Sequence, residues 1–324
     1  MVLNQSANPD AKRIRLNFSN FWPDFTPQEF LCGFPYLLKH YEFVLDSNPD
    51  FVFYSVFGRA KKINRHAQRI LFCGESGDPF RTGSPLGWRF AVPGSFHWGL
   101  TMAVENDDPR HIYFPLMCLH HYHHNDGLNS LIRKSGELCG PKEFFCNFIY
   151  SNAKAQRRIE FFKKLSHYKR VEAPANVEQN RPPLPKANER GGYLEKQRFQ
   201  SRCKFTMAFE NAAYPGYTTE KLSDAFVARS VPIYWGNPRV EEIFNPDSFI
   251  NVNQFKSDEE AIEFIRAVDE DDQLYQKIWS APPFRDNVIP RQFADGTYLS
   301  FFKRIFDQKP SRLGRIFDRI MPRH

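Results

Sequence analysis

Residues 204–239 constrain the fold more than any other stretch of this chain, because they read as strand, loop, helix and strand in close succession. Residues 204–209 are apolar, as in a short buried strand, and residues 210–217 carry the asparagine, proline and glycine typical of a loop. Thr218 or Thr219 can cap a helix that continues to residue 229. Residues 231–235 predict a second strand. The two strands of such a βαβ unit must be parallel.

Ligands of open parallel sheets bind beyond the carboxyl ends of the strands, where a helix N-terminus offers free N–H groups. In this chain that position holds Glu210, Asn211, Tyr217, Glu220 and Lys221. A lysine in the first turn opposes the helix dipole, and an anionic ligand such as a diphosphate would offset that cost. The alternative is a capped surface helix whose charged side chains are solvated.

The same stretch resembles the donor-binding motif of the α-1,3/4-fucosyltransferases, glycosyltransferase family 10, and among these the bacterial lipopolysaccharide type. The resemblance is carried by Phe-Glu-Asn at 209–211, Tyr-Thr-Thr-Glu-Lys at 217–221 and Val-Pro-Ile-Tyr-Trp-Gly at 231–236. It implies an α/β fold of the GT-B type, with two Rossmann-like domains facing a cleft. It also implies an inverting enzyme that uses GDP-β-L-fucose as donor.

Length and composition agree with two α/β domains. A chain of 324 residues is long enough for two cores, and its 33 phenylalanines predict that these cores are rich in aromatic residues. The net charge of +7 favours anionic ligands or surfaces. The chain carries no nucleic-acid-binding motif, so nucleic acid is not an expected partner.

The six cysteines have no CxxC spacing and several lie in apolar runs, which indicates buried, reduced thiols rather than disulfides. The sequence shows no signal peptide and no run of ~20 apolar residues. We therefore expect a cytoplasmic protein of the bacterial type.

The first half of the chain alternates short apolar segments with more polar ones. Its pattern predicts a helix over 28–39 and strands over 13–18, 41–45, 48–56, 69–73, 96–102 and 110–116. This alternation is typical of a doubly wound α/β layer. We expect residues 1–140 to form the acceptor-binding domain that the family resemblance implies.

Gly74 and Glu75 follow the strand over 69–73, which places the Glu75 carboxylate on the ligand side of a parallel sheet. The family has a Gly-Glu pair here, and the resemblance implies that Glu75 is the catalytic base. Ser76 departs from the family, whose bacterial members often have asparagine at this position. The alternative for Glu75 is a solvated turn residue.

The second half predicts a strand over 144–150, a helix over 154–167, a long polar loop over 176–200, a strand over 249–252 and a helix over 258–268. In the family a Ser-Asn turn precedes a helix whose arginine contacts the donor diphosphate. The resemblance thus assigns Ser151, Asn152 and Arg158 to the donor site, with Arg157 as the alternative arginine. Residues 141–300 are the expected GDP-fucose-binding domain.

His120, His121, His123 and His124 form the one histidine-rich motif of the chain. His120 and His124 have the i, i+4 spacing of metal ligands on a helix, but no acid or cysteine with ligand spacing accompanies them. We favour a polar helix and assign no metal site.

The C-terminal residues 301–324 are expected to form a basic amphipathic tail. The tetrapeptide Arg-Ile-Phe-Asp occurs at 304–307 and again at 315–318. Such a segment can lie on an anionic membrane, here the inner face of the bacterial inner membrane, or dock on the protein itself.

The predicted reaction moves L-fucose to a GlcNAc or glucose hydroxyl of a LacNAc-type glycan. The linkage favoured is α-1,3, with α-1,4 left open, and the product would be a Lewis-type O-antigen or other surface glycan. No essential metal is implied, although stimulation by Mn²⁺ or Mg²⁺ stays open. Two alternatives remain: a glycosyltransferase with another GDP-sugar donor, and a catalytically idle protein that binds a nucleotide or glycan.

Overall fold

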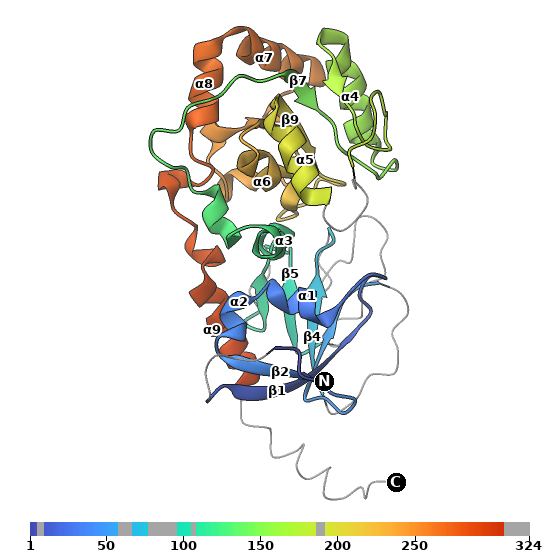
Figure 1. Cartoon of the computed structure of the whole chain (residues 1–324), viewed down its shortest axis with the longest axis vertical. Helices are drawn as coiled ribbons and strands as arrows, with labels where there is room; N and C mark the ends of the chain where they lie inside the picture. The colour runs from blue at the N-terminus through green and yellow to red at the C-terminus, as the bar shows by residue number, and fades with distance from the viewer. Residues whose placement is uncertain (5–9, 58–66, 77–95, 105–107, 186–191, 308–324) are drawn as a thin grey trace, which may run out of the picture. The chain divides into compact units, whose positions relative to one another are not determined.

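The computed structural model describes residues 1–4, 10–57, 67–76, 96–104, 108–185 and 192–307. These residues form two compact units (Figure 1). Of the described residues, the first unit holds those within 1–101, those at 108–114 and those at 291–307, and the second holds 102–104 and those within 115–290. The chain thus enters the second unit at Pro115, whereas the expected domains divide at residue 140. Helix α3 (Leu116–His124) explains the difference, because it packs on α6 (Glu220–Val227).

The described part of the first unit is built on a six-stranded parallel sheet in the order β2-β1-β3-β4-β5-β6. The strands β3, β4 and β5 are short and largely apolar, as in a sheet covered on both faces. The strands expected from the sequence in this half are confirmed, as is the doubly wound α/β layer. They are β1 (Lys12–Ser19), β2 (Tyr41–Leu45), β3 (Phe51–Tyr54), β4 (Gln68–Cys73), β5 (Trp98–Thr101) and β6 (His111–Tyr113).

The single helix expected over 28–39 is wrong, because the segment forms two helices, α1 (Pro27–Cys32) and α2 (Pro35–Leu38). Thr26 caps α1 by accepting a hydrogen bond from the Glu29 backbone N–H. The first helix ends at Gly33, and Pro35 then starts the second. Proline lacks the N–H that a continuous helix needs, but it fits the first turn of a new one.

Helix α9 (Asp295–Phe306) returns to the first unit and runs beside α2 (Figure 1). Phe302 and Phe306 are buried, and the Phe306 ring packs on those of Tyr41, Phe43 and Phe51. Residues 301–306 of the expected tail thus form part of a helix that docks on the protein, which is one of the two alternatives that the sequence left open. The first Arg-Ile-Phe-Asp copy belongs to this docked helix and its C-cap, whereas residues 308–324, with the second copy, lie outside the described residues.

The second unit contains a five-stranded parallel sheet within its described residues, in the order β11-β10-β9-β7-β8. Pro232 is tolerated in this sheet because β10 pairs with β11 only from Ile233 onward, so Pro232 lies where that edge has no partner strand. The strands are β7 (Phe144–Asn147), β8 (Val171–Glu172), β9 (Cys203–Phe209), β10 (Val231–Trp235) and β11 (Ile250–Asn251).

The remaining helices of the second unit are α4 (Gln156–Tyr168), α5 (Gly192–Ser201), α7 (Asp258–Glu270) and α8 (Asp272–Ser280). The loop expected over 176–200 is wrong for its last residues, which form α5. The Pro- and Gly-rich part of that segment ends before Tyr193, so a helix can begin there. Short 3-10 helices complete the chain: η1 (Gly127–Leu131), η2 (Val240–Glu242), η3 (Pro246–Ser248), η4 (Val252–Gln254), η5 (Arg285–Asn287) and η6 (Arg291–Phe293).

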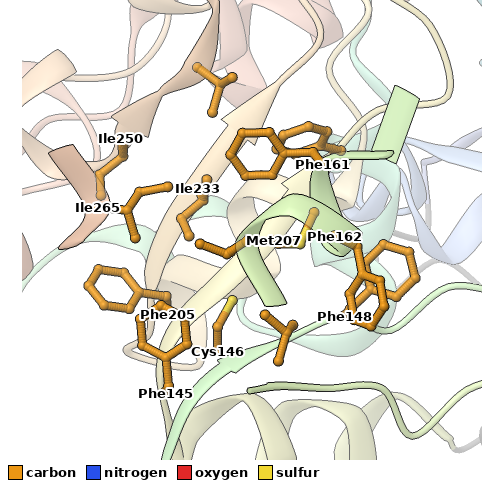
Figure 2. Close-up of a cluster of buried hydrophobic side chains, with 14 of the residues drawn as sticks. Phe145, Cys146, Phe148, Phe161, Phe162, Phe205, Met207, Ile233, Ile250 and Ile265 are labelled. Carbon is orange, nitrogen blue, oxygen red and sulfur yellow. The ribbon is translucent and has the colours of Figure 1, made fainter. Parts of the chain in front are cut away.

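One face of the second sheet carries a large aromatic core (Figure 2). Side chains alternate along a strand, so Phe205, Met207 and Phe209 of β9 point to the same face. There they pack with apolar residues of α4, α7 and α8. Helices α5 and α6 also contact β9, and α6 contacts β10. The core thus fixes where β9 and β10 end, and those ends carry the candidate site.

The six cysteines, all in the described part of the chain, are free thiols. Cys73, Cys118, Cys146 and Cys203 are buried, Cys139 is half-buried and Cys32 is exposed. Apart from the exposed Cys32, this is the pattern that their apolar neighbours predict.

Candidate active site

The candidate site begins where β9 ends, at Glu210. Its backbone N–H donates to the Trp235 carbonyl at 2.8 Å, which extends the pairing of β9 with β10 by one residue. Its side chain is fully buried and turns toward the N-terminus of α6. There the carboxylate accepts hydrogen bonds from the Thr219 backbone N–H at 2.8 Å and from the Thr219 hydroxyl at 2.8 Å. A carboxylate of the chain itself therefore satisfies part of this helix N-terminus.

Gly236 makes room for the Glu210 side chain. A Cβ at this position would lie 2.5 Å from Cγ and 2.7 Å from Cβ of Glu210, and 2.9 Å from the Tyr234 hydroxyl. Only glycine fits without moving one of these groups. The Trp-Gly pair that ends β10 thus has a steric reason in the structure.

Lys221 is one of the two cations of the site, and it lies at the start of α6. Its ammonium lies 3.3 Å from Glu210 Oε2 and 3.6 Å from Glu220 Oε1, and it donates to the Thr219 hydroxyl at 2.8 Å. Burial disfavours the charged lysine, but the two carboxylates outweigh burial and raise the pKa of Lys221. Burial likewise disfavours ionised Glu220, but Lys221 and Lys196 lower the pKa of Glu220 to about 2. Lys221 and Glu220 are therefore charged at neutral pH.

Arg158, from the first turn of α4, is buried beside this cluster at 1% exposure. Its guanidinium donates to Asn211 Oδ1 and lies over the Tyr150 ring, 4.2 Å from the ring centroid. Its Nε is buried and has no hydrogen-bond partner among the described residues. The Tyr150 hydroxyl is held in turn by the Met207 carbonyl and the Phe209 N–H. Arg158 therefore ties α4 to the start of the loop after β9.

Asn237 holds the other end of that loop. Its buried side chain accepts hydrogen bonds from the Gly216 N–H at 2.8 Å and the Arg239 N–H at 2.9 Å, and donates to the Thr218 hydroxyl at 3.0 Å. The Tyr217 side chain between them is 2% exposed. The loop is thus closed by hydrogen bonds at both ends before any ligand binds.

Asp224, one turn further along α6, joins three helices. Its carboxylate lies 2.8 Å from Lys196 Nζ of α5 and 3.0 Å from His120 Nε2 of α3. Burial disfavours its charge, but Lys196 and His120 outweigh burial and hold the pKa of Asp224 well below its usual range. This anchor fixes the helix that carries Glu220 and Lys221.

Glu75 lies in the first unit, two residues after β4 ends at Cys73. Because β4 is an interior strand between β3 and β5, its carboxyl end is the edge where parallel sheets bind ligands. The side chain of Glu75 is half-buried, and the neighbouring Ser76 is fully buried. The structure therefore places Glu75 at the sheet edge that the sequence predicted.

Two family models match the chain. One, described as "Glycosyltransferase family 10 (fucosyltransferase) C-term", matches residues 140–281, and the other, described as "Alpha-(1,3)-fucosyltransferase FucT N-terminal domain", matches residues 16–120. The chain belongs to glycosyltransferase family 10. The N-terminal match ends at residue 120 and the C-terminal match begins at residue 140. The compact units divide earlier, at Pro115, because α3 packs within the second unit.

Curated relatives agree with this family. The chain is 27% identical over 303 residues to an α-(1,3)-fucosyltransferase of Helicobacter pylori, covering 82% of this chain and 59% of the relative. It is 43% identical over 77 residues to 4-galactosyl-N-acetylglucosaminide 3-α-L-fucosyltransferase 9 of Mus musculus, covering 23% of this chain and 21% of the relative. The chain therefore spans less than two thirds of the length of these relatives.

Solved structures of an α1,3-fucosyltransferase share the fold of this family 10 chain. One matches with a TM-score of 0.73 at 23% identity, covering 95% of this chain and 94% of the other. A structure of such an enzyme with GDP-fucose matches with a TM-score of 0.70 at 23% identity, covering 94% of each chain. The α/β fold of the GT-B type expected from the sequence is confirmed.

The donor residues expected from the family 10 motif lie in two different settings. Arg158, Asn211, Glu220 and Lys221 surround the ends of β9 and the start of α6, and the buried Tyr217 belongs to the same loop. Ser151 and Asn152 are exposed in the turn before α4, where Asn152 Oδ1 accepts from the Lys154 N–H at 3.0 Å. The alternative arginine, Arg157, is paired with Asp258 of α7.

The sequence assigned no donor-site role to four side chains that organise the site: Glu210, which it placed at the helix N-terminus, Thr219, which it offered as a helix cap, and Asp224 and Lys196, which it did not single out. Glu210 and Thr219 stand inside the family 10 motif, so their sequence position was a usable signal. Asp224 and Lys196 meet only through the packing of α6 on α5, and no local pattern marks such a pair.

The histidine-rich motif is the helix α3, as expected, but not a uniformly polar one. Met117, Cys118, Leu119 and His121 are buried, His120 faces Asp224, and the His124 ring stacks on Tyr193 at 4.5 Å. Among the residues that the structure describes, no group of three His, Cys, Asp or Glu side chains is arranged to hold a metal ion. Within the same residues, no helix is both long and apolar enough to span a membrane.

Proposed function

We propose that this chain is an inverting α-1,3-fucosyltransferase that moves L-fucose from GDP-β-L-fucose to a hydroxyl of a GlcNAc (or glucose) residue in a LacNAc-type glycan. The observation that carries this proposal is the cluster of Glu220, Lys221, Arg158 and Asn211 at the carboxyl ends of β7 and β9. It combines two cations with hydrogen-bonding groups at the edge where parallel sheets bind nucleotides.

In this proposal the second unit binds the donor. Lys221 supplies positive charge to the diphosphate as it leaves, where negative charge develops. Its side chain is 16% exposed, so the ammonium is within reach of a ligand. Arg158 keeps Asn211 in place, and its guanidinium adds positive charge next to the diphosphate. Asn211, Tyr217 and Glu220 orient the ribose, diphosphate and fucose, while Ser151 and Asn152 border the site from the turn before α4.

Glu75 acts as the general base. It takes the proton from the acceptor hydroxyl while the acceptor oxygen bonds to the anomeric carbon of fucose. The bond from that carbon to the diphosphate oxygen breaks on the opposite face, and GDP leaves with the bonding electrons. The charge of the leaving group is met by Lys221 and Arg158, so the scheme requires no essential metal ion. A stimulating effect of Mn²⁺ or Mg²⁺ is compatible with it.

The acceptor proposal follows the curated relatives. The name of the mouse relative gives 4-galactosyl-N-acetylglucosaminide as its acceptor, and that of the H. pylori relative gives an α-(1,3) linkage. By analogy we propose a role in Lewis-type O-antigen or other surface-glycan synthesis at the cytoplasmic face of a bacterial inner membrane. Residues 308–324, with their arginines, are the segment proposed to contact anionic lipid.

The product tests this function. The protein is incubated with GDP-fucose and N-acetyllactosamine, and the linkage and anomeric configuration of the product are read by NMR. An α-linked fucose on O3 of GlcNAc is expected, because inversion converts the β-linked donor to an α product. A β-linked product would contradict inversion, and transfer from GDP-mannose in preference to GDP-fucose would contradict the donor.

A further inference from the structure

Glu210 occupies the position that a ligand anion would take at the start of α6. Its carboxylate holds the Thr219 N–H, the Thr219 hydroxyl and the Lys221 ammonium at once. The side chain has no exposure to solvent, and Gly236 lies directly against it. Glu210 is therefore enclosed by the chain and shielded from water in this position.

Lys221 is shared between two carboxylates. One ammonium faces two carboxylates, Glu210 at 3.3 Å and Glu220 at 3.6 Å. Three other groups lie nearby: Lys196 of α5 and His120 of α3 face Asp224, and Arg158 of α4 donates to the neutral amide of Asn211. The other titratable groups that face the pair are the hydroxyls of Tyr150 and Tyr217, which bring no positive charge. A diphosphate that binds Lys221 thus adds negative charge beside two carboxylates that already share this ammonium.

We propose that Glu210 is a positioning residue that holds Lys221 while the site is empty, and that it takes up a proton from solvent when a nucleoside diphosphate binds there. This inference rests on the proposed function, because it needs the donor diphosphate at Lys221. Protonation removes one negative charge and leaves a carboxyl group that still hydrogen-bonds Thr219. The proton returns to solvent when the nucleotide departs.

Glu210 is a better proton acceptor than Glu220. The Glu220 side chain is 24% exposed and reaches water, whereas that of Glu210 does not. Burial raises the pKa of Glu210 above its ordinary value although Lys221 opposes this effect, whereas the pKa of Glu220 is lowered. Once the diphosphate competes for Lys221, the buried carboxylate loses the group that keeps it ionised.

Calorimetry of GDP-fucose binding without acceptor tests the proposal. The diphosphate of GDP-fucose is esterified at both ends and does not titrate near neutral pH, so a change in protonation must come from the protein. Titrations at pH 7.5 in HEPES and in Tris separate proton uptake from the intrinsic heat of binding. We expect uptake of up to one proton per nucleotide, and a Kd that rises up to tenfold per pH unit between pH 7 and 8.

Glu210→Gln keeps the shape of the side chain and removes the titrating group. We expect this variant to bind GDP-fucose without proton uptake and with a Kd that does not change between pH 7 and 8. A role in stability alone would lower the melting temperature without changing the number of protons. Glu172→Gln is the matched control, because Glu172 is also buried and paired with arginines, and it should take up protons like the wild type.

Thr219→Val supplies a second variant should Glu210→Gln not fold. It removes a hydroxyl donor that favours the ionised carboxylate, so proton uptake should persist to higher pH than in the wild type. Equal enthalpies in the two buffers for the wild type, or undiminished uptake in Glu210→Gln, would overturn the inference. Absence of any GDP-fucose binding would instead overturn the proposed function.

Discussion

Glu210 and Lys221 form a buried ion pair, with 3.3 Å between Oε2 and Nζ, across the loop that joins β9 to α6. This pair shows which group of the chain offsets the positive charge of Lys221. A lysine in the first turn of a helix is unfavourable by itself, and the sequence predicts that a ligand anion offsets its charge. In the structure a glutamate of the chain already does so, which lets the lysine stay charged and in place before the donor arrives.

Lys221→Met should weaken GDP-fucose binding by about 10- to 100-fold, because it removes the cation proposed to meet the diphosphate. It should also destabilise the fold by about 3 kcal/mol, since Glu210 would be left buried without its partner. Calorimetry measures the first effect and urea unfolding the second. Lys169→Met is the control, because Lys169 forms a half-exposed pair with Asp269 away from the site. Unchanged GDP-fucose affinity in Lys221→Met would remove this lysine from the donor site.

Gly236→Ala should lower the free energy of unfolding by about 1–3 kcal/mol, because its Cβ would overlap the buried Glu210 side chain. Gly140→Ala is the matched control in the same unit, since a Cβ there would meet nothing within 4 Å. Urea unfolding curves compare the two variants. Equal stability of both alanine variants would show that the end of β10 yields to the extra methyl group, contrary to the close contact described.

His121 should make the protein less stable in mild acid. Burial lowers the pKa of His121 to about 4, from an ordinary value of 6.5. Between these values the unfolded chain binds a proton that the folded chain does not, so stability falls as pH drops from 6.5 toward 4. The effect is at most about 3 kcal/mol.

His121→Gln should flatten this pH dependence, whereas His167→Gln, at an exposed position, should leave it unchanged. Urea unfolding at pH 5 and pH 7.5 supplies the comparison. If His121→Gln lost as much stability between pH 7.5 and pH 5 as the wild type does, the loss of stability in acid would have to come from other groups.

Glu75→Gln should keep GDP-fucose affinity and lose about 10²- to 10⁴-fold in transfer rate, as expected when a general base is removed. Initial rates with N-acetyllactosamine measure the loss, and calorimetry measures donor binding. Glu42→Gln is the control, since Glu42 pairs with Arg13 on the surface of the same unit. Turnover close to that of the wild type would exclude Glu75 as the base.

The sequence was informative wherever structure depends on a local pattern. The strands β9 and β10 and the helix between them follow from apolar spacing and turn residues within a single stretch, and this is why the donor loop could be placed. Glu75 was placed for a similar reason, since a glycine and an acid directly follow an apolar strand.

The rest depends on contacts between distant segments or on proline positions that change a helix. Helix α5 was not predicted because a Pro- and Gly-rich stretch precedes it in the sequence. Pro35 divides the helix expected over 28–39 into two. The pairing of Asp224 with His120 and Lys196 joins residues from three helices, and a single sequence gives no sign of it. Glu210 was within the recognised motif, but its complete burial was visible only in the structure.

The most direct test of the central claim is GDP release from GDP-fucose in EDTA, with and without N-acetyllactosamine. The proposed mechanism predicts release that depends on the acceptor and continues without free metal ions, because Lys221 and Arg158 supply the positive charge. No release in the presence of acceptor, even after manganese is added, would contradict the assignment of this chain as a fucosyltransferase.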